Sequence, residues 1–227
     1  MTIDYKKIAE SFDPGLAAVA EALDHSPFEW FVIGGWALDL FLDAKIRPHK
    51  DIEVSIWRDQ AGSLFDFYGE HRIDQVVGNK RYESIYAPSD IDSRGHLIIR
   101  NAAFLEQQTL DIELFLSPRQ HGYWNFRKDS TISVPLASAV IQTASGLRVL
   151  APHLVLLFKA WFFPNMEKTI GDAPQEEEFL RKCWQVDCRD FETVLPFLSA
   201  SQRDMLTGWL KEYVPGIPWL TGLSSRS

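Results

Sequence analysis

The sequence has little cysteine, no excess of basic residues and no long apolar run. The chain has two cysteines, Cys183 and Cys188, with four residues between them and no second pair. They support neither a secreted disulfide framework nor a zinc site. The most apolar stretch, residues 153–164, is too short to span a bilayer and contains Lys159. The N-terminus has no apolar signal core. These absences predict a cytoplasmic protein without a membrane partner.

Acidic residues outnumber basic residues, 31 to 23, which gives a formal net charge of −8. Because the chain has no overall basic field, a nucleic-acid polymer is not expected as its partner. A small nucleotide remains compatible with this balance, since local groups can meet its charge. The acidic excess also suits a cationic ligand.

The chain of 227 residues fits one domain with a modest second lobe. Alternating and apolar segments predict an α/β half over residues 1–140, and 3.6-residue spacings predict a helical half over residues 141–227. Strands are expected at EWFVI, DIEVSIW, RYESIY, HLIIR, TLDIELFL and TISVPL. In the second half, helices are expected at ASAVIQTA, APHLVLLFKAWFF, QEEEFLRKCW, DFETVLPFL and ASQRDMLTGWLKEY.

Two expected strands each carry a pair of carboxylates at alternate positions. Asp51 and Glu53 share one strand face, and Asp111 and Glu113 share another, because residues i and i+2 of a strand point the same way. If these strands are neighbours, three or four carboxylates converge. Oxygen ligands of this kind suit Mg²⁺, and such a cluster is typical of two-metal phosphoryl transfer.

A Gly34-Gly35 turn precedes the first acidic strand and opens an expected helix at residues 36–42. Such a turn lets backbone N–H groups approach a triphosphate at the positive end of a helix. The loop that follows the helix offers further phosphate contacts from Arg47, His49 and Lys50. Taken singly, the glycines indicate a tight turn and each acidic pair a solvated edge strand. Their conjunction favours a nucleotide site.

The run IGGWALDLFLDAKIRPHKDIEV, residues 33–54, resembles the signature of DNA-polymerase-beta-like nucleotidyltransferases, most closely the aminoglycoside and lincosamide branch. That branch has Gly-Gly-Trp, an acidic residue three positions later, and an Arg-x-His-x-Asp-x-Asp run. The corresponding residues of this chain are Gly34, Gly35, Trp36, Asp39, Arg47, His49, Asp51 and Glu53. It departs at Glu53, where the family more often has Asp. Later segments resemble, more weakly, the helical lobe of related bacterial proteins.

The resemblance implies an α+β nucleotidyltransferase fold, with a small mixed sheet flanked by helices and a helical lobe that closes one side of a cleft. It implies transfer of a nucleoside monophosphate, expected to be AMP from ATP, to a hydroxyl of an aminoglycoside-like molecule with two Mg²⁺ ions. The expected metal and catalytic residues are Asp51, Glu53 and Asp111, the last as general base. Glu113 is expected either to support these residues or to contact the acceptor. The expected nucleotide-binding residues are Gly34, Gly35, Trp36, Arg47, His49 and Lys159.

Three alternatives stay open at this point. Lys159, within LLFKAWFF, is either a phosphate-binding lysine or a surface lysine with a buried stem. The chain is either an enzyme or a non-catalytic nucleotide-sensing or antitoxin-like module of the same fold. As an enzyme, it acts either on a small molecule or on a hydroxyl of a partner protein.

Overall fold

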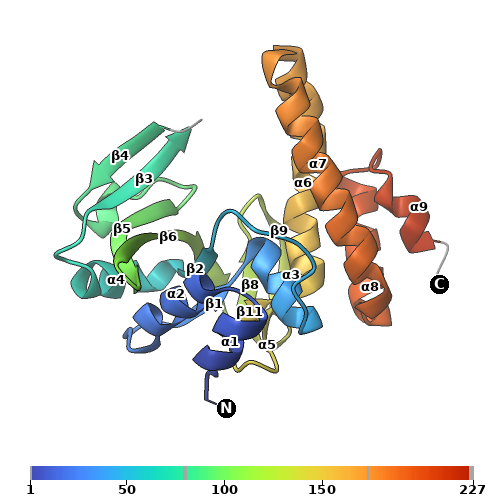
Figure 1. The fold of residues 1–227 in the computed structure, drawn as a ribbon. Helices are drawn as coiled ribbons and strands as arrows, with labels where there is room; N and C mark the ends of the chain where they lie inside the picture. The colour runs from blue at the N-terminus through green and yellow to red at the C-terminus, as the bar shows by residue number, and fades with distance from the viewer. Residues whose placement is uncertain (1, 79–80, 173, 225–227) are drawn as a thin grey trace. The chain divides into compact units, whose positions relative to one another are not determined.

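The structure is a computed structural model that describes residues 2–78, 81–172 and 174–224. It divides into two compact units, Met1–Leu150 and Ala151–Ser227. The first contains the sheets and the second is helical (Figure 1).

The first unit is built on a mixed sheet. Among the described residues this sheet has eight strands in the order β10-β11-β1-β2-β6-β5-β3-β4. Strand β1 pairs antiparallel with β2, and β2 pairs parallel with β6. The strands are β1 (Trp30–Val32), β2 (Glu53–Trp57), β3 (Ile73–Gly78), β4 (Arg81–Ile85), β5 (His96–Leu105), β6 (Gln108–Ser117), β10 (Val140–Gln142) and β11 (Arg148–Leu150). The β3–β4 hairpin forms one edge (Figure 1).

Short helices and a second sheet complete this unit. Helix α2 packs against β5 and β6, and α3 packs against β2 and β11. Asp4 and Asp13 cap α1 and α2 by accepting backbone N–H hydrogen bonds. The helices are α1 (Tyr5–Ser11), α2 (Pro14–Asp24), α3 (Gly34–Leu42), α4 (Ala61–Phe67) and α5 (Leu136–Ala139), with 3₁₀ turns at Arg58–Gln60 and Pro88–Asp90. The second sheet consists of β7 (Arg119–Gln120), β8 (Tyr123–Phe126) and β9 (Asp129–Pro135).

Alternation along β2 and β6 gives the main sheet one aliphatic face and one mixed face, on which the acidic residues lie beside Trp57 and Phe115. Val54, Ile56 and Leu114 are buried in the core. The intervening positions carry the acidic residues and Ser55, whose hydroxyl lies 2.7 Å from the Ser117 hydroxyl and donates to the Phe115 carbonyl. The period-2 pattern therefore orients Asp111 and Glu113 on β6 as predicted, whereas β2 begins at Glu53 and leaves Asp51 just before the strand.

The second unit consists of packed helices. These are α6 (Pro152–Asp172), α7 (Glu177–Val194), α8 (Ala200–Tyr213) and α9 (Trp219–Ser224), with 3₁₀ turns at Pro174–Glu176 and Leu195–Phe197. Helix α6 packs against α7 and α8 (Figure 1). The Trp219 ring of α9 stacks on α7, with centroids 4.5 Å from Phe191 and 5.2 Å from Trp184. In the described part of the chain, no helix combines the length and apolarity needed to cross a membrane.

The predicted α+β class is confirmed, and three local predictions need correction. The expected helix at ASAVIQTA ends at Ala139, and the β-branched residues Val140 and Ile141 continue as strand β10. Because β10 and β11 belong to the main sheet, the structure divides after Leu150 rather than after residue 140. The two helices expected at QEEEFLRKCW and DFETVLPFL form the single helix α7.

A buried histidine makes the helical unit sensitive to acid. His153 on α6 is 1% exposed, and no described residue hydrogen-bonds either ring nitrogen. Burial lowers its pKa to about 4. Because an unfolded histidine titrates near 6.5, the unfolded chain binds the proton first as the pH falls. We expect the free energy of unfolding to drop by roughly 3 kcal/mol between pH 6.5 and 4 through this residue.

Urea unfolding at several pH values checks this prediction in the His153→Phe variant. Phenylalanine keeps an aromatic ring beside Trp209, whose centroid lies 6.0 Å from that of His153. We expect the variant to lose less stability than the wild type between pH 6.5 and 4. His25→Gln, at an exposed position, is the control. Parallel stability curves for the wild type and His153→Phe would contradict the prediction.

Candidate functional site

The Gly-Gly turn brings the backbone against an acidic side chain of β2. Gly34 has a φ of +63°, and a Cβ atom there would lie 1.8 Å from Oε2 of Glu53. Glycine is therefore required both for the backbone conformation and for the close approach. Gly34 opens α3, and Ile33 at the N-cap provides no side-chain hydrogen bond. The first N–H groups of the helix thus point out of the turn without a side-chain cap.

His49 covers the second glycine. A Cβ atom at Gly35 would lie 2.4 Å from the His49 ring and 2.6 Å from an Arg47 guanidinium nitrogen. Nε2 of His49 is 2.9 Å from Oδ2 of Asp39, and both side chains are buried. The His49 ring also packs on Trp36, with centroids 4.3 Å apart. The motif is therefore one contact unit in which Asp39 and Trp36 hold His49 against the turn.

Three carboxylates gather beside this turn. Glu53 on β2 is in register with Glu113 on the parallel neighbour β6. Asp51 is just before β2, and its pKa is raised by desolvation and by the Glu113 carboxylate, against the opposing effect of Lys50. Nε2 of His96 lies 2.6 Å from Oε1 of Glu113. The repulsion between Asp51 and Glu113 is the condition that a divalent cation relieves.

Asp111 has different partners. Nη1 of Arg100 donates to its Oδ2 at 2.7 Å, and the backbone N–H of Asn101 donates to its Oδ1 at 2.9 Å. Arg100 is itself held by Asp74, which is fully buried. Burial alone would raise the Asp74 pKa, but hydrogen bonds from Arg72, Arg100 and Ser84 hold it below its usual value. The Arg100 guanidinium therefore bridges a buried anion and Asp111.

Asp111 also lines a separate cavity of about 510 Å³ with residues that follow α4, including His71 and Arg72. None of the residues around the Gly-Gly turn lines this cavity. The structure thus assembles Asp51, Glu53 and Glu113 and engages Asp111 elsewhere. Register and charge favour Glu113 over Asp111 as the third carboxylate.

Lys159, expected to bind phosphate, belongs to the helical unit and is held by two carboxylates. Its amine lies 2.6 Å from Oδ1 of Asp187 and 3.0 Å from Oδ2 of Asp190. Burial would lower its pKa, but the two carboxylates hold the pKa above its ordinary value. The position is that of a structural ion pair between α6 and α7.

Replacing Lys159 by Met separates the structural role from a phosphate-binding role. The change leaves two buried carboxylates together, so we expect a loss of about 3–5 kcal/mol in unfolding free energy. ATP affinity of the folded variant should stay unchanged. Urea denaturation and ATP titration measure the two quantities. Lys182→Met, which removes an exposed pair with Glu178, is the matched control. Weaker ATP binding without destabilisation would restore the phosphate-binding assignment.

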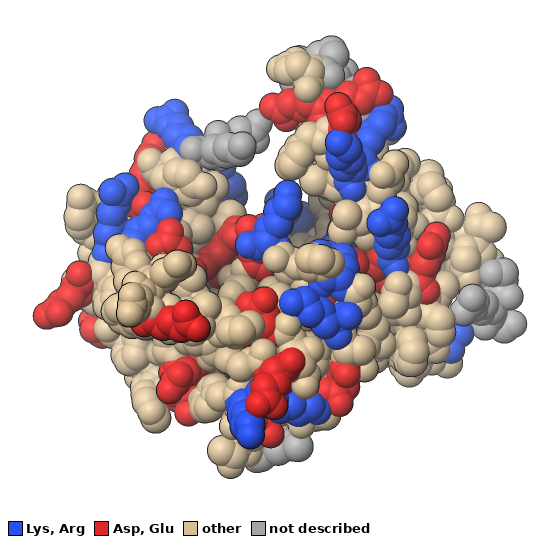
Figure 2. Space-filling model, viewed as in Figure 1, with Lys and Arg blue, Asp and Glu red and all other residues tan. Residues whose placement is uncertain are grey.

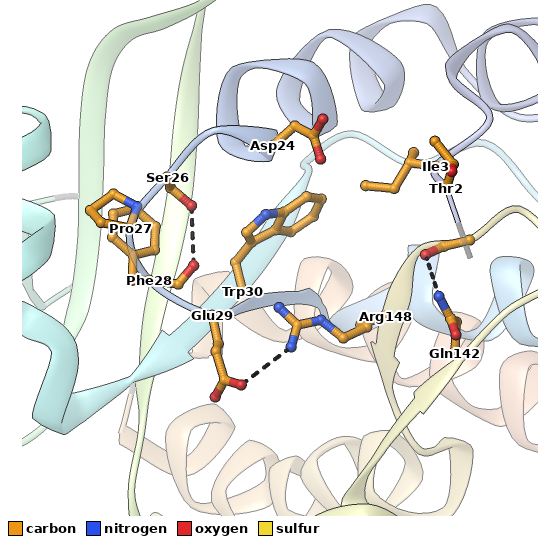
Figure 3. A pocket seen from close by; sticks show the side chains of 11 residues that line it. Thr2, Ile3, Asp24, Ser26, Pro27, Phe28, Glu29, Trp30, Gln142 and Arg148 are labelled. Carbon is orange, nitrogen blue, oxygen red and sulfur yellow. Dashed lines mark hydrogen bonds and ion pairs between the residues drawn. The ribbon is translucent and has the colours of Figure 1, made fainter.

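A further cavity lies at the opposite end of β1 from the Gly-Gly turn. It has a volume of about 520 Å³, and Trp30, Asp24 and Arg148 line it. Figure 3 shows Trp30 pointing into it, with Asp24 on one side and the pair of Glu29 and Arg148 (3.7 Å) on the other. No residue of the carboxylate site lines this cavity. This cavity is therefore separate from the carboxylate site.

Sequence reasoning missed two side chains at the carboxylate site. His96 pairs with Glu113 and stacks on Phe115, with centroids 4.1 Å apart. Arg127 follows β8 and is attracted by the Glu53 carboxylate. Neither residue belongs to a local motif. Only strand register and tertiary contact bring them to the site.

Comparison with known families identifies the class as a nucleotidyltransferase, as the sequence resemblance indicated. The chain belongs to the aminoglycoside-2''-adenylyltransferase family, whose sequence model matches residues 15–138. That range contains the Gly-Gly turn and all four acidic positions. The family is one of enzymes that transfer nucleotidyl groups.

Several solved structures are similar at low identity. The solution structure of the antibiotic-resistance factor ANT(2'')-Ia is 12% identical, covers 88% of this chain and 91% of its own, and has a TM-score of 0.46. The lincomycin-bound lincosamide antibiotic adenylyltransferase LnuA is 9% identical, and the match covers 70% of this chain and 87% of LnuA with a TM-score of 0.41. An antigenic nucleotidyltransferase-like protein from Paracoccidioides brasiliensis is 13% identical, and the match covers 94% of each chain with a TM-score of 0.46. No curated protein matches the chain.

Proposed function

We propose that this protein transfers AMP from ATP to a hydroxyl of a small, cationic, aminoglycoside-like acceptor and releases pyrophosphate. The observation that carries the proposal is the contact between Gly34 and the Glu53 carboxylate, which joins a phosphate-binding turn to an acidic strand. The family match over residues 15–138 supports the same reaction and supplies the acceptor class.

Asp51, Glu53 and Glu113 are the carboxylates that would hold divalent cations. Among the described residues, no group of three or more His, Cys, Asp or Glu side chains is close enough together to hold a metal ion as it stands. The donor set nevertheless fits Mg²⁺, because it offers hard oxygens and because burial and, after it, the Glu113 carboxylate raise the pKa of Asp51, which a bound cation would offset. When bound, Mg²⁺ would polarise the phosphate oxygens and neutralise developing charge.

The residues of the turn would hold the nucleotide. The N–H groups at the start of α3 face the phosphates, and Arg47 and His49 add side-chain contacts beside Gly35. Asp39 and Trp36 fix His49 and so act as positioning residues. A nucleotide bound here would have its phosphates between the turn and the carboxylates.

The proposed reaction forms a bond between the acceptor oxygen and the α-phosphorus. The bond from the α-phosphorus to the bridging oxygen of pyrophosphate breaks, and its electron pair stays with the pyrophosphate. The acceptor proton goes to a carboxylate base, for which Glu113 is best placed because it adjoins both Asp51 and His96. The net charge of −8 favours a cationic acceptor.

The charged surface agrees with a small-molecule partner. On the face drawn in Figure 2, Lys and Arg side chains are interspersed with Asp and Glu rather than forming a continuous basic surface. Binding of a nucleic-acid polymer relies on such a surface. We therefore do not include a polymer among the proposed acceptors.

Pyrophosphate release tests the proposal. The purified protein is assayed with each of the four nucleoside triphosphates and Mg²⁺ against aminoglycosides, lincosamides and bacterial lysate, and products are identified by mass spectrometry. We expect ATP-dependent pyrophosphate and an acceptor whose mass increases by one adenylyl group. ATP binding without turnover would instead support a nucleotide-sensing module, and label on a protein band would support protein adenylylation.

A further inference from the structure

Two cations form a tight turn in the second sheet. Arg127 and Lys128 connect β8 to β9, and Phe126 pairs with Asp129 across them. Oδ1 of Asp129 accepts hydrogen bonds from the backbone N–H of Thr131 at 2.9 Å and from its hydroxyl at 2.6 Å. The turn is therefore short and fixed at its exit, unlike a long surface loop.

The Arg127 guanidinium lies over the face of the main sheet that carries the carboxylates. Its carbon is 4.7 Å from the ring centroid of Phe115, and Nη1 donates to the Arg94 carbonyl at 3.2 Å. Phe115 follows Glu113 by two residues on β6, so both side chains project from the same face about 7 Å apart along the strand. Arg127 thus lies within one side-chain length of the carboxylate site.

Charge links Arg127 to the same site. The Glu53 carboxylate attracts it, and that carboxylate also contacts the Gly34 backbone position. Desolvation lowers the pKa of Arg127 and of Lys128, and the neighbouring cations lower the latter further. Cations that have lost hydration gain more from an anionic ligand than fully exposed cations do. This cationic turn is a local exception in a chain whose net charge is −8.

We propose that Arg127, assisted by Lys128, binds the β- and γ-phosphates of the triphosphate and stabilises the pyrophosphate as it departs. The inference rests on the proposed function and adds a second phosphate contact to the one at the Gly-Gly turn. Glu53 then lies between the two, with Gly34 on one side and Arg127 on the other. The guanidinium meets the oxygen that gains negative charge when the bond to the α-phosphorus breaks.

Binding measurements on Arg127→Gln test this assignment. ATP, pyrophosphate and AMP, each with Mg²⁺, are titrated calorimetrically against the wild type and the variant. We expect ATP and pyrophosphate to bind about 10- to 100-fold more weakly, because charge-assisted hydrogen bonds are lost. AMP should bind within about twofold of wild type, since it lacks the phosphates concerned. Arg127→Lys, which keeps the charge, should recover part of the affinity.

Arg119→Gln is the matched control. Arg119 lines the same cavity of about 760 Å³ as Arg127 and Lys128, but its guanidinium is held by Glu29 at 2.8 Å and Asp59 at 3.0 Å. We expect its removal to leave ATP and pyrophosphate binding unchanged. An equal loss in both variants would mean that general charge, not this site, attracts the phosphates, and would overturn the assignment.

Lys128→Gln keeps the test independent of folding, because the Lys128 side chain, although partly desolvated, is more exposed than that of Arg127. It should weaken pyrophosphate binding a few-fold without lowering the melting temperature. Normal adenylyl transfer by the wild type together with unchanged ATP and pyrophosphate binding by Arg127→Gln overturns the Arg127 assignment alone. Failure of the wild type to bind any of the three probes overturns both this inference and the proposed function.

Discussion

Asp51→Asn should abolish adenylyl transfer while leaving the protein at least as stable as the wild type. The loss in turnover should be roughly a thousandfold or more, because a carboxylate-bound metal contributes several kcal/mol of transition-state stabilisation. Stability should not fall, because Asp51 and Glu113 repel one another without a cation. Turnover with saturating ATP and the melting temperature measure the two effects.

The difference in stability between Asp51→Asn and the wild type should depend on pH. The folded-state pKa of Asp51 is raised, so its ionisation opposes folding at neutral pH. The stability gain of Asp51→Asn should be present above the folded-state pKa. It should disappear as the pH falls below the unfolded value near 3.8, where Asp51 becomes protonated in both states. Asp66→Asn, at an exposed position on α4, is the control. A destabilised Asp51→Asn that still transfers AMP would assign the residue to structure.

The parts of the site that could be predicted are those encoded within one short segment. The Gly34-Gly35 turn and the alternation of DIEVSIW are local, and the structure has the helix and strand that they predict. The shared acidic pattern left open whether this strand and TLDIELFL are neighbours, and the structure shows that β2 and β6 are. Binary patterning fixes which face each residue takes because the strand period is two.

The choice between Asp111 and Glu113 could not be read from that period, because both residues face the same way. It depends on two non-local facts: Glu113 is the register partner of Glu53, and Arg100 from β5 holds Asp111. The same limit applies to Arg127, whose sequence neighbourhood, NFRKDS, predicts a turn and nothing more. Contacts between segments far apart in the chain are set by tertiary packing, which local patterns do not encode.

Lys159 shows the converse case, in which a local pattern allowed two interpretations. A lysine inside LLFKAWFF fits a phosphate ligand or a lysine with a buried stem, and the sequence contains nothing to choose between them. The structure supplies a third answer, because Asp187 and Asp190 on α7 both meet its amine. A buried cation with two carboxylates is costly to separate, which ties α6 to α7.

Glu113→Gln should reduce turnover by roughly a hundredfold or more, the usual contribution of a positioned general base. Its carboxylate adjoins Asp51 and His96, so it is placed both to complete a metal site and to accept the acceptor proton. Glutamine keeps the size and the hydrogen-bonding capacity but not the charge. The apparent affinity for the acceptor should change little, because the lost interaction is made in the transition state.

Asp111→Asn is the matched comparison, on the same strand and the same face. We expect less than about a tenfold change in turnover, since its oxygens are already engaged by Arg100 and the Asn101 backbone. The variant should instead melt at a lower temperature, because Arg100 loses one of its two anionic partners. Measuring both variants with saturating ATP decides between them. An inactive Asp111→Asn beside a working Glu113→Gln would return the catalytic role to Asp111. Arg100 would then have to release that carboxylate when substrate binds.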